Sequence, residues 1–218
     1  LDNIPEEYVA LKESLAGAFS LRESTIAQAL GKSTIQIGFR KITYQYTSAD
    51  VKGKPITLSA VAFWLGYFAD GVWSNLSPEN ICLMEHYTIT SDAETPSNTF
   101  ALEMFMTGNT LTIMPDYIGY GVTKELLHPY LNHDVCAINS IDALTAGYDL
   151  FNDNVECGMS QGWQLYLAGA SQGAANAIAV HKYLDTHLDL AAKWNFAASN
   201  WSRPVSVWTA PTLSRHWK

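Results

Sequence analysis

The stretch Trp163-Gln-Leu-Tyr-Leu-Ala-Gly169-Ala-Ser171-Gln-Gly173-Ala-Ala-Asn-Ala-Ile178 decides the fold prediction. It begins as an apolar run typical of a buried strand and ends in small residues that favour a closely packed helix. Between them lies a Gly-x-Ser-x-Gly pattern, whose glycines allow close backbone approach around a strained, exposed serine. The other interpretation of this pattern is an N-cap serine beside a glycine turn. The strand before it and the helix after it favour a nucleophilic serine.

The residues around this stretch alternate between strand-like and helix-like patterns. The predicted strands are 81–84, 111–114, 163–168 and a last one beginning at 195–198, and the predicted helices are 5–30, 100–106, 135–151 and 173–188. Runs 34–46 and 55–63 flank a polar turn and predict an antiparallel hairpin, while 70–80 is predicted as a loop. This alternation predicts an α/β fold with a mostly parallel sheet after the hairpin. The strand, glycine-flanked serine and helix at 163–188 resemble the nucleophile elbow of the α/β-hydrolase type.

The same pattern divides the chain into three parts. We expect an N-terminal helical segment at 1–33, a partial α/β-hydrolase core at 34–199 and an atypical tail at 200–218. A chain of this length forms one hydrophobic core.

Composition excludes several function classes. The net charge is −8 and the 13 basic residues are scattered, which argues against a nucleic-acid partner. No apolar run approaches the roughly 20 residues that span a bilayer. The three cysteines fit no zinc motif and leave the redox compartment open.

Five further segments precede the serine pattern in a fixed order. They are Asp50 to Phe63, Met84-Glu-His86-Tyr87-Thr88 with Pro96-Ser-Asn98, Met114-Pro-Asp116-Tyr-Ile-Gly-Tyr-Gly121, His128-Pro-Tyr-Leu131 and Ser140-Ile-Asp-Ala-Leu144. Together with the Gly-x-Ser-x-Gly pattern they resemble the secretory-lipase-like α/β-hydrolases, a family of secreted esterases and lipases. The resemblance covers residues 35–190 and rests on the shared order of the segments.

The resemblance implies a role for each matching residue. Ser171 would attack an acyl carbonyl, and Gly169 and Gly173 would form its nucleophile elbow. The backbone N–H of Gln172 would be one oxyanion donor, and the second would come from Tyr87 or Thr88. Tyr87 replaces a glycine of the family, and its bulky ring would narrow the acyl pocket.

Other polar residues are expected to support this site rather than react. His86 is expected to orient backbone rather than to act as a base. Asp116 precedes Ser171, whereas the triad acid of this fold follows it, so we interpret Asp116 as a hydrogen-bond acceptor that braces a loop. We expect His128 and His133 to be loop or surface residues, and His181 to point away from Ser171.

A serine needs a histidine and an acid, and in this fold both follow the serine. Only 47 residues follow Ser171, so the chain is expected to lack the last strands and a complete triad, although His216 comes late enough. The segment Trp201-Ser-Arg-Pro-Val205 matches nothing in the family. The codons TGG AGC CGG CCC GTA could encode this segment. When the same bases are read one position later, they encode Gly-Ala-Gly-Pro-Tyr, the segment that the family has there. A frameshift near Asn200, a truncation and divergence stay open.

The resemblance implies hydrolysis of a small-molecule or lipid carboxylic ester, with no metal or organic cofactor and a secreted or periplasmic location. One alternative is an inactive hydrolase remnant that associates, for example as a homo-oligomer, through an exposed sheet edge. A weaker alternative is a carbohydrate- or lipid-binding surface, suggested by seven tryptophans and eleven tyrosines. Aromatic residues more often fill a core, and no aromatic stripe favours that alternative.

Overall fold

The computed structural model describes residues 25–32, 34–99 and 109–196. The described chain forms two compact units. One contains the residues up to Arg40 together with Leu65–Leu76, and the other contains Lys41–Trp64 and the residues from Ser77 onward. Of the predicted helix at 5–30, residues 25–29 are described and helical, and the predicted helix at 100–106 lies outside the described residues.

The predicted hairpin is present as β1 (Gln36–Ala49) and β2 (Pro55–Ala69), both longer than expected. The Asp50 carboxylate builds the turn by accepting the N–H groups of Lys52 and Lys54, each at 2.8 Å. Gly53 completes it at φ 74°, a conformation that glycine adopts without steric cost. Because a five-residue loop joins neighbouring strands, β1 and β2 run antiparallel.

The parallel part of the sheet follows this hairpin. It contains β4 (Asn80–Glu85), β5 (Thr110–Pro115) and β6 (Leu165–Gly169), with β4 parallel to both neighbours. The strand order is β1-β2-β5-β4-β6, with β2 antiparallel to β5. The α/β fold with an antiparallel N-terminal hairpin is therefore confirmed.

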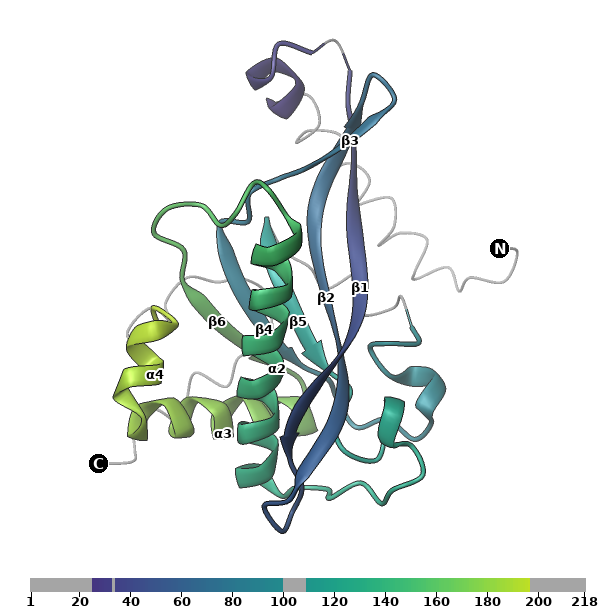
Figure 1. Ribbon diagram of the computed structural model, residues 1–218, viewed down its shortest axis with the longest axis vertical. Helices are drawn as coiled ribbons and strands as arrows, with labels where there is room; N and C mark the ends of the chain where they lie inside the picture. The colour runs from purple at the N-terminus through teal and green to yellow at the C-terminus, as the bar shows by residue number, and fades with distance from the viewer. Residues whose placement is uncertain (1–24, 33, 100–108, 197–218) are drawn as a thin grey trace. The chain divides into compact units, whose positions relative to one another are not determined.

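Two helices pack against this sheet. The helix α2 (His133–Asn154) packs against β5, and α3 (Gln172–Thr186) packs against β6 and β4. Figure 1 shows α2 beside the strands and α3 crossing the view at a steep angle to α2, followed by α4 (Leu188–Lys193). At Gly147 the sheet comes so close that an added Cβ would lie 2.5 Å from the Tyr44 hydroxyl. That hydroxyl donates to the Ala143 carbonyl at 2.7 Å, which fixes α2 to β1.

Alternate residues of β2 enter two separate cores, as the period of a strand requires. Ala62 and Trp64 join the core shared with α2 and α3, and Trp64 meets Phe151 edge to face at 5.3 Å. Val61 and Phe63 join a smaller cluster that includes Met114. Burial of each large side chain contributes roughly 2–3 kcal/mol.

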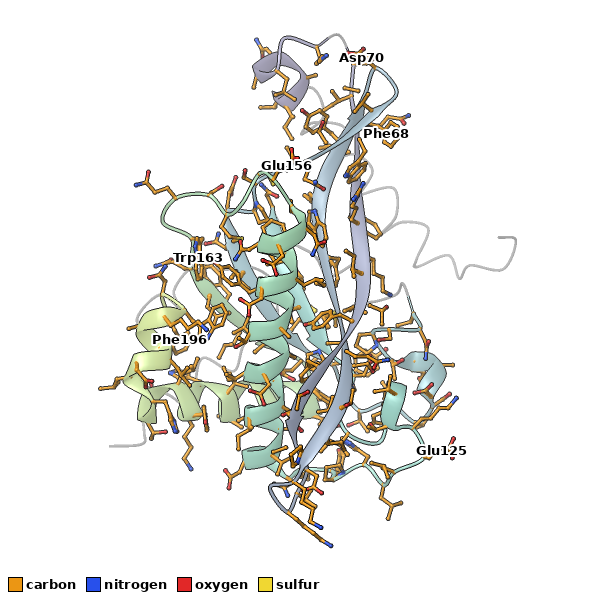
Figure 2. All side chains as sticks on the ribbon, viewed as in Figure 1. Phe68, Asp70, Glu125, Glu156, Trp163 and Phe196 are labelled. Carbon is orange, nitrogen blue, oxygen red and sulfur yellow. The ribbon has the colours of Figure 1, made fainter. Side chains whose placement is uncertain are left out.

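Aromatic residues also pack together next to the start of β6. Trp163 packs against Tyr148 at 5.6 Å and against Trp194 at 6.3 Å between ring centroids. Figure 2 labels Trp163 and Phe196, which line a shallow pocket with Ala191 and Ala192 of α4. Core and pocket packing of this kind accounts for these tryptophans without an aromatic binding stripe.

Three sequence predictions need correction. The stretch 70–80 is not all loop, because it contains β3 (Val72–Asn75), which pairs with the end of β2. Asp70 and Gly71 make the turn with φ 54° and 77°, the left-handed pair typical of a two-residue hairpin. The predicted helix 173–188 divides at His187 into α3 and α4. Asn195 and Phe196 are not strand, and 197–198 lie outside the described residues.

Candidate functional site

The Ser171 turn, residues Gly169–Gly173, joins β6 to α3 without a loop. Ser171 has φ 52° and ψ −119°, a conformation that costs a non-glycine residue on the order of 1–3 kcal/mol. Its side chain is exposed, and its hydroxyl makes no hydrogen bond to any described residue. Such strain persists only where the surroundings enforce it. The turn therefore presents, at the N-terminus of a helix, a hydroxyl that no described residue engages.

The two glycines of this turn are required by close backbone contacts. A Cβ on Gly169 would lie 2.3 Å from the Gly173 carbonyl oxygen. A Cβ on Gly173 would lie 2.1 Å from the carbonyl oxygen of Glu85, the last residue of β4. The first turn of α3 is thus pressed against the carboxyl end of β4, and both flanking glycines are explained by sterics.

The predicted donor groups lie at this same end of the sheet. Tyr87 and Thr88 follow β4 and are exposed, and Gln172 is the first residue of α3. None of the three backbone N–H groups donates to a described residue. Thr88 Oγ1 lies 3.1 Å from the Tyr130 hydroxyl, which links this loop to the segment after β5. Three backbone donors without an acceptor among the described residues therefore lie at the Ser171 end of the sheet.

His86 is buried between backbone groups. Its Nδ1 lies 2.7 Å from the Tyr87 carbonyl oxygen, its Nε2 lies 3.3 Å from that of Asp116, and its ring stacks on Tyr117 at 3.9 Å. Burial lowers the pKa of His86 to about 4. A neutral imidazole carries one N–H, so it donates to one of these two carbonyl groups, and its ring packs among backbone groups.

Asp116 is fully buried and accepts hydrogen bonds from three donors. Its carboxylate receives the Ser59 hydroxyl at 2.6 Å, the Ser97 hydroxyl at 2.5 Å and the Ser97 N–H at 2.9 Å. Burial raises the pKa of Asp116, and these hydrogen bonds oppose that effect. The carboxylate joins β2, the loop at 97 and β5, as a bracing acceptor would.

His128 belongs to the site, which the sequence did not indicate. Its Nδ1 lies 2.7 Å from the Ile118 carbonyl oxygen, so Nδ1 carries the proton. Nε2 is then the acceptor, and it lies 2.8 Å from the side-chain nitrogen of Gln172. His128 thus anchors the residue next to Ser171. The signal that could have found it is its position in a segment shared with the resembled family.

The described residues do not complete a triad. Ser171 has no histidine partner among them, and His181 instead lies 3.4 Å from Asp185 on the surface of α3. His216 lies outside the described residues. No group of metal-ligating side chains occurs among the described residues, and no described helix could cross a membrane.

Solved structures of two bacterial proteins are similar to this chain. One is a Legionella pneumophila protein classed only provisionally as a hydrolase, with 24% identity and a TM-score of 0.59 over 72% of this chain and 41% of that one. The other is the rice cell wall degrading esterase LipA from Xanthomonas oryzae, with 22% identity and a TM-score of 0.59 over 79% of this chain and 44% of LipA. Neither a family model nor a curated protein sequence matches the chain.

The chain spans less than half the length of these two proteins. At these identities the similarity shows the fold alone. The site described above lies at the carboxyl end of the parallel strands, the end at which open α/β sheets bind ligands. This chain therefore has the α/β fold of structures that include an esterase.

Proposed function

We propose that this chain carries the nucleophile of a serine hydrolase that cleaves carboxylic esters through an acyl-Ser171 intermediate. The single observation that carries the proposal is the backbone of Ser171, at φ 52° and ψ −119° between β6 and α3. A nucleophile elbow requires this strand-turn-helix geometry, with glycines at both flanks. An N-cap serine would instead have a β-region backbone and a capping hydrogen bond, and Ser171 has neither.

The reaction would proceed in two steps. The Ser171 hydroxyl oxygen attacks the ester carbonyl, its proton passes to a general base, and the alcohol leaves with a proton. Water then attacks the acyl-serine, releases the carboxylic acid and restores the hydroxyl. The negative oxygen formed in each step needs donors, and the free N–H groups of Gln172 and of Tyr87 or Thr88 fit that role.

The exposed Tyr87 ring lies where the resembled family has glycine, so it would narrow the space beside the oxyanion. We therefore propose small-molecule or short-chain esters as the preferred substrates, with lipid esters as a second class. The general base would come from residues beyond the described part of the chain or from another chain.

The test is hydrolysis of short-chain p-nitrophenyl esters by the purified protein and by Ser171→Ala. Turnover that disappears in Ser171→Ala is the expected result. Ser160→Ala is the matched control, because Ser160 precedes β6 at the opposite end of the strand and bonds the Ser77 carbonyl. Equal rates for the wild type and Ser171→Ala would sink the proposal.

A second function is favoured by one observation: Ser171 has no histidine partner among the described residues. In that case the chain is an inactive remnant that associates through β6, which ends the described strand order and has one described neighbour, β4. Light scattering tests the homo-oligomer, and a strictly monomeric protein without turnover contradicts both functions. Secretion or a periplasmic location is a further proposal, tested by fractionation of the source cells.

A further inference from the structure

A second carboxyl group lies directly behind the Ser171 turn. Glu85 ends β4, its side chain is 2% exposed, and its carbonyl oxygen touches Gly173. Neither carboxyl oxygen has a well-aligned hydrogen bond to a described residue. No described lysine or arginine pairs with it either. A buried carboxylate without a charge partner is costly, so the neutral form is favoured.

Buried polar groups from three elements surround this carboxyl group. The hydroxyls of Ser140 on α2 and of Tyr117 after β5 border it, and Asn176 on α3 borders Tyr117. Ser140 Oγ and both side-chain polar atoms of Asn176 are also buried without an aligned partner. The set is therefore a cluster of buried polar groups from β4, α2, α3 and the residues after β5.

This polar cluster lies next to both sides of the proposed oxyanion site. The Tyr117 hydroxyl donates to the His86 carbonyl at 3.3 Å, immediately before Tyr87 and Thr88. Gly173, on the other side, rests on the carbonyl oxygens of Glu85 and His86. A displacement of the Glu85–His86 backbone would therefore act on both the β4 loop and the first turn of α3.

We propose that Glu85 is a positioning residue, whose buried carboxyl group lies beside Ser140 and Tyr117 and, as long as it does not compete for the Tyr117 hydroxyl, leaves the Tyr87–Thr88 loop fixed against the Ser171 turn. This inference rests on the proposed function, because the two sides must act together only if an ester binds between them. An ionised carboxylate would draw the Tyr117 hydroxyl away from the His86 carbonyl and loosen the loop.

Titration distinguishes this role from simple burial. Burial raises the pKa of Glu85 to about 7. The other titratable groups facing it are Tyr46 on β1, Cys82 on β4, Cys136 on α2 and Tyr117, and burial raises the pKa of each. None of these ionises near neutrality, so a transition there belongs to Glu85 or to a histidine.

The experiment follows the carboxyl carbon of Glu85 by NMR in the full chain labelled with [δ-13C]glutamate, assigned by its absence in Glu85→Gln. The amide signals of Gln172, Gly173 and Thr88 are followed in parallel. We expect the carbon to titrate near pH 7 and the three amides to move with the same midpoint. In Glu85→Gln, which keeps a neutral polar group, the amides should stay at their low-pH positions.

Asp142→Asn is the matched control, since Asp142 is a half-buried carboxyl on α2 that bonds Ser48 and does not touch the turn. It should leave the titration unchanged. An amide movement that survives in Glu85→Gln but disappears in His128→Gln would overturn the inference, as would a Glu85 titration that the amides do not follow. The measurement needs no turnover, so an inactive protein leaves it fully informative.

Discussion

Asp116 and Glu85 are both buried carboxyl groups near the same end of the sheet, but they differ in the hydrogen-bond donors around them. Asp116 receives three hydrogen bonds from Ser59 and Ser97, whereas Glu85 has no aligned donor. Three donors around a carboxylate hold a loop in a single arrangement. A carboxyl group without such donors changes its interactions when it gains or loses a proton. The comparison therefore assigns a structural role to Asp116 and a pH-sensitive position to Glu85.

The largest loss of stability should come from adding a methyl group at Gly173, where the backbone contacts the Glu85 carbonyl oxygen. In Gly173→Ala the added methyl would collide with the Glu85 carbonyl oxygen, since a Cβ there lies 2.1 Å from it. Backbone has to move on both sides, and we expect a loss of about 4 kcal/mol in unfolding free energy. Urea unfolding measures it. Gly158→Ala is the control for an added methyl group that meets no neighbouring atom, and its φ of 61° adds a strain that Gly173, in α3, does not have.

Removing the Asp116 carboxylate should lower the unfolding free energy by slightly less. Asp116→Ala leaves the Ser59 hydroxyl and the Ser97 N–H and hydroxyl without their acceptor. We expect a loss of about 3 kcal/mol in the same assay. A loss below about 1 kcal/mol would mean that water replaces the carboxylate, and the contrast with Glu85 would then disappear.

The pH dependence of stability should identify Glu85. Its folded-state pKa of about 7 lies above the ordinary 4.5, so the folded chain binds the extra proton between these values. The associated stabilisation is complete below pH 4.5 and is lost as the pH rises to about 7. The difference between wild type and Glu85→Gln should change by roughly 3 kcal/mol across this window. A flat difference would show that Glu85 titrates normally.

The smallest loss of stability should come from replacing His128, which lies between the segment after β5 and the first turn of α3. In His128→Phe the Ile118 carbonyl and the Gln172 amide each lose one partner. Both hydrogen bonds are part-buried and neutral, so we expect a loss of about 1 kcal/mol. His187→Phe is the control, because His187 is half-buried on the surface between α3 and α4. Equal losses would remove His128 from the site.

Local signals made the Ser171 turn predictable. A strand, a glycine-flanked serine and a small-residue helix are adjacent in sequence, and their geometry follows from sterics within a few residues. The hairpin and the parallel strands were predictable for the same reason, because each element carries its own period. The strand β3 was missed although the Asp70-Gly71 pair is a recognised hairpin signal.

Long-range contacts explain what the sequence left out. The His128 side chain hydrogen-bonds Gln172, which lies 44 positions away in the sequence, and no sequence periodicity predicts such a contact. Glu85 follows an apolar strand, and only the fold reveals that α2 and α3 bury it. The role expected for Asp116 came from its order in the chain, but its three donors come from residues 19 and 57 positions away.

The most direct test of Ser171 as the nucleophile is mass spectrometry of the protein acid-quenched shortly after mixing with p-nitrophenyl butyrate. A covalent acyl-enzyme should accumulate when the second step is slower than the first. We predict a butyryl group on the peptide that contains Ser171, and none on that peptide in Ser171→Ala. An acyl group on any other residue, or turnover of the ester by Ser171→Ala at the wild-type rate, would contradict the account.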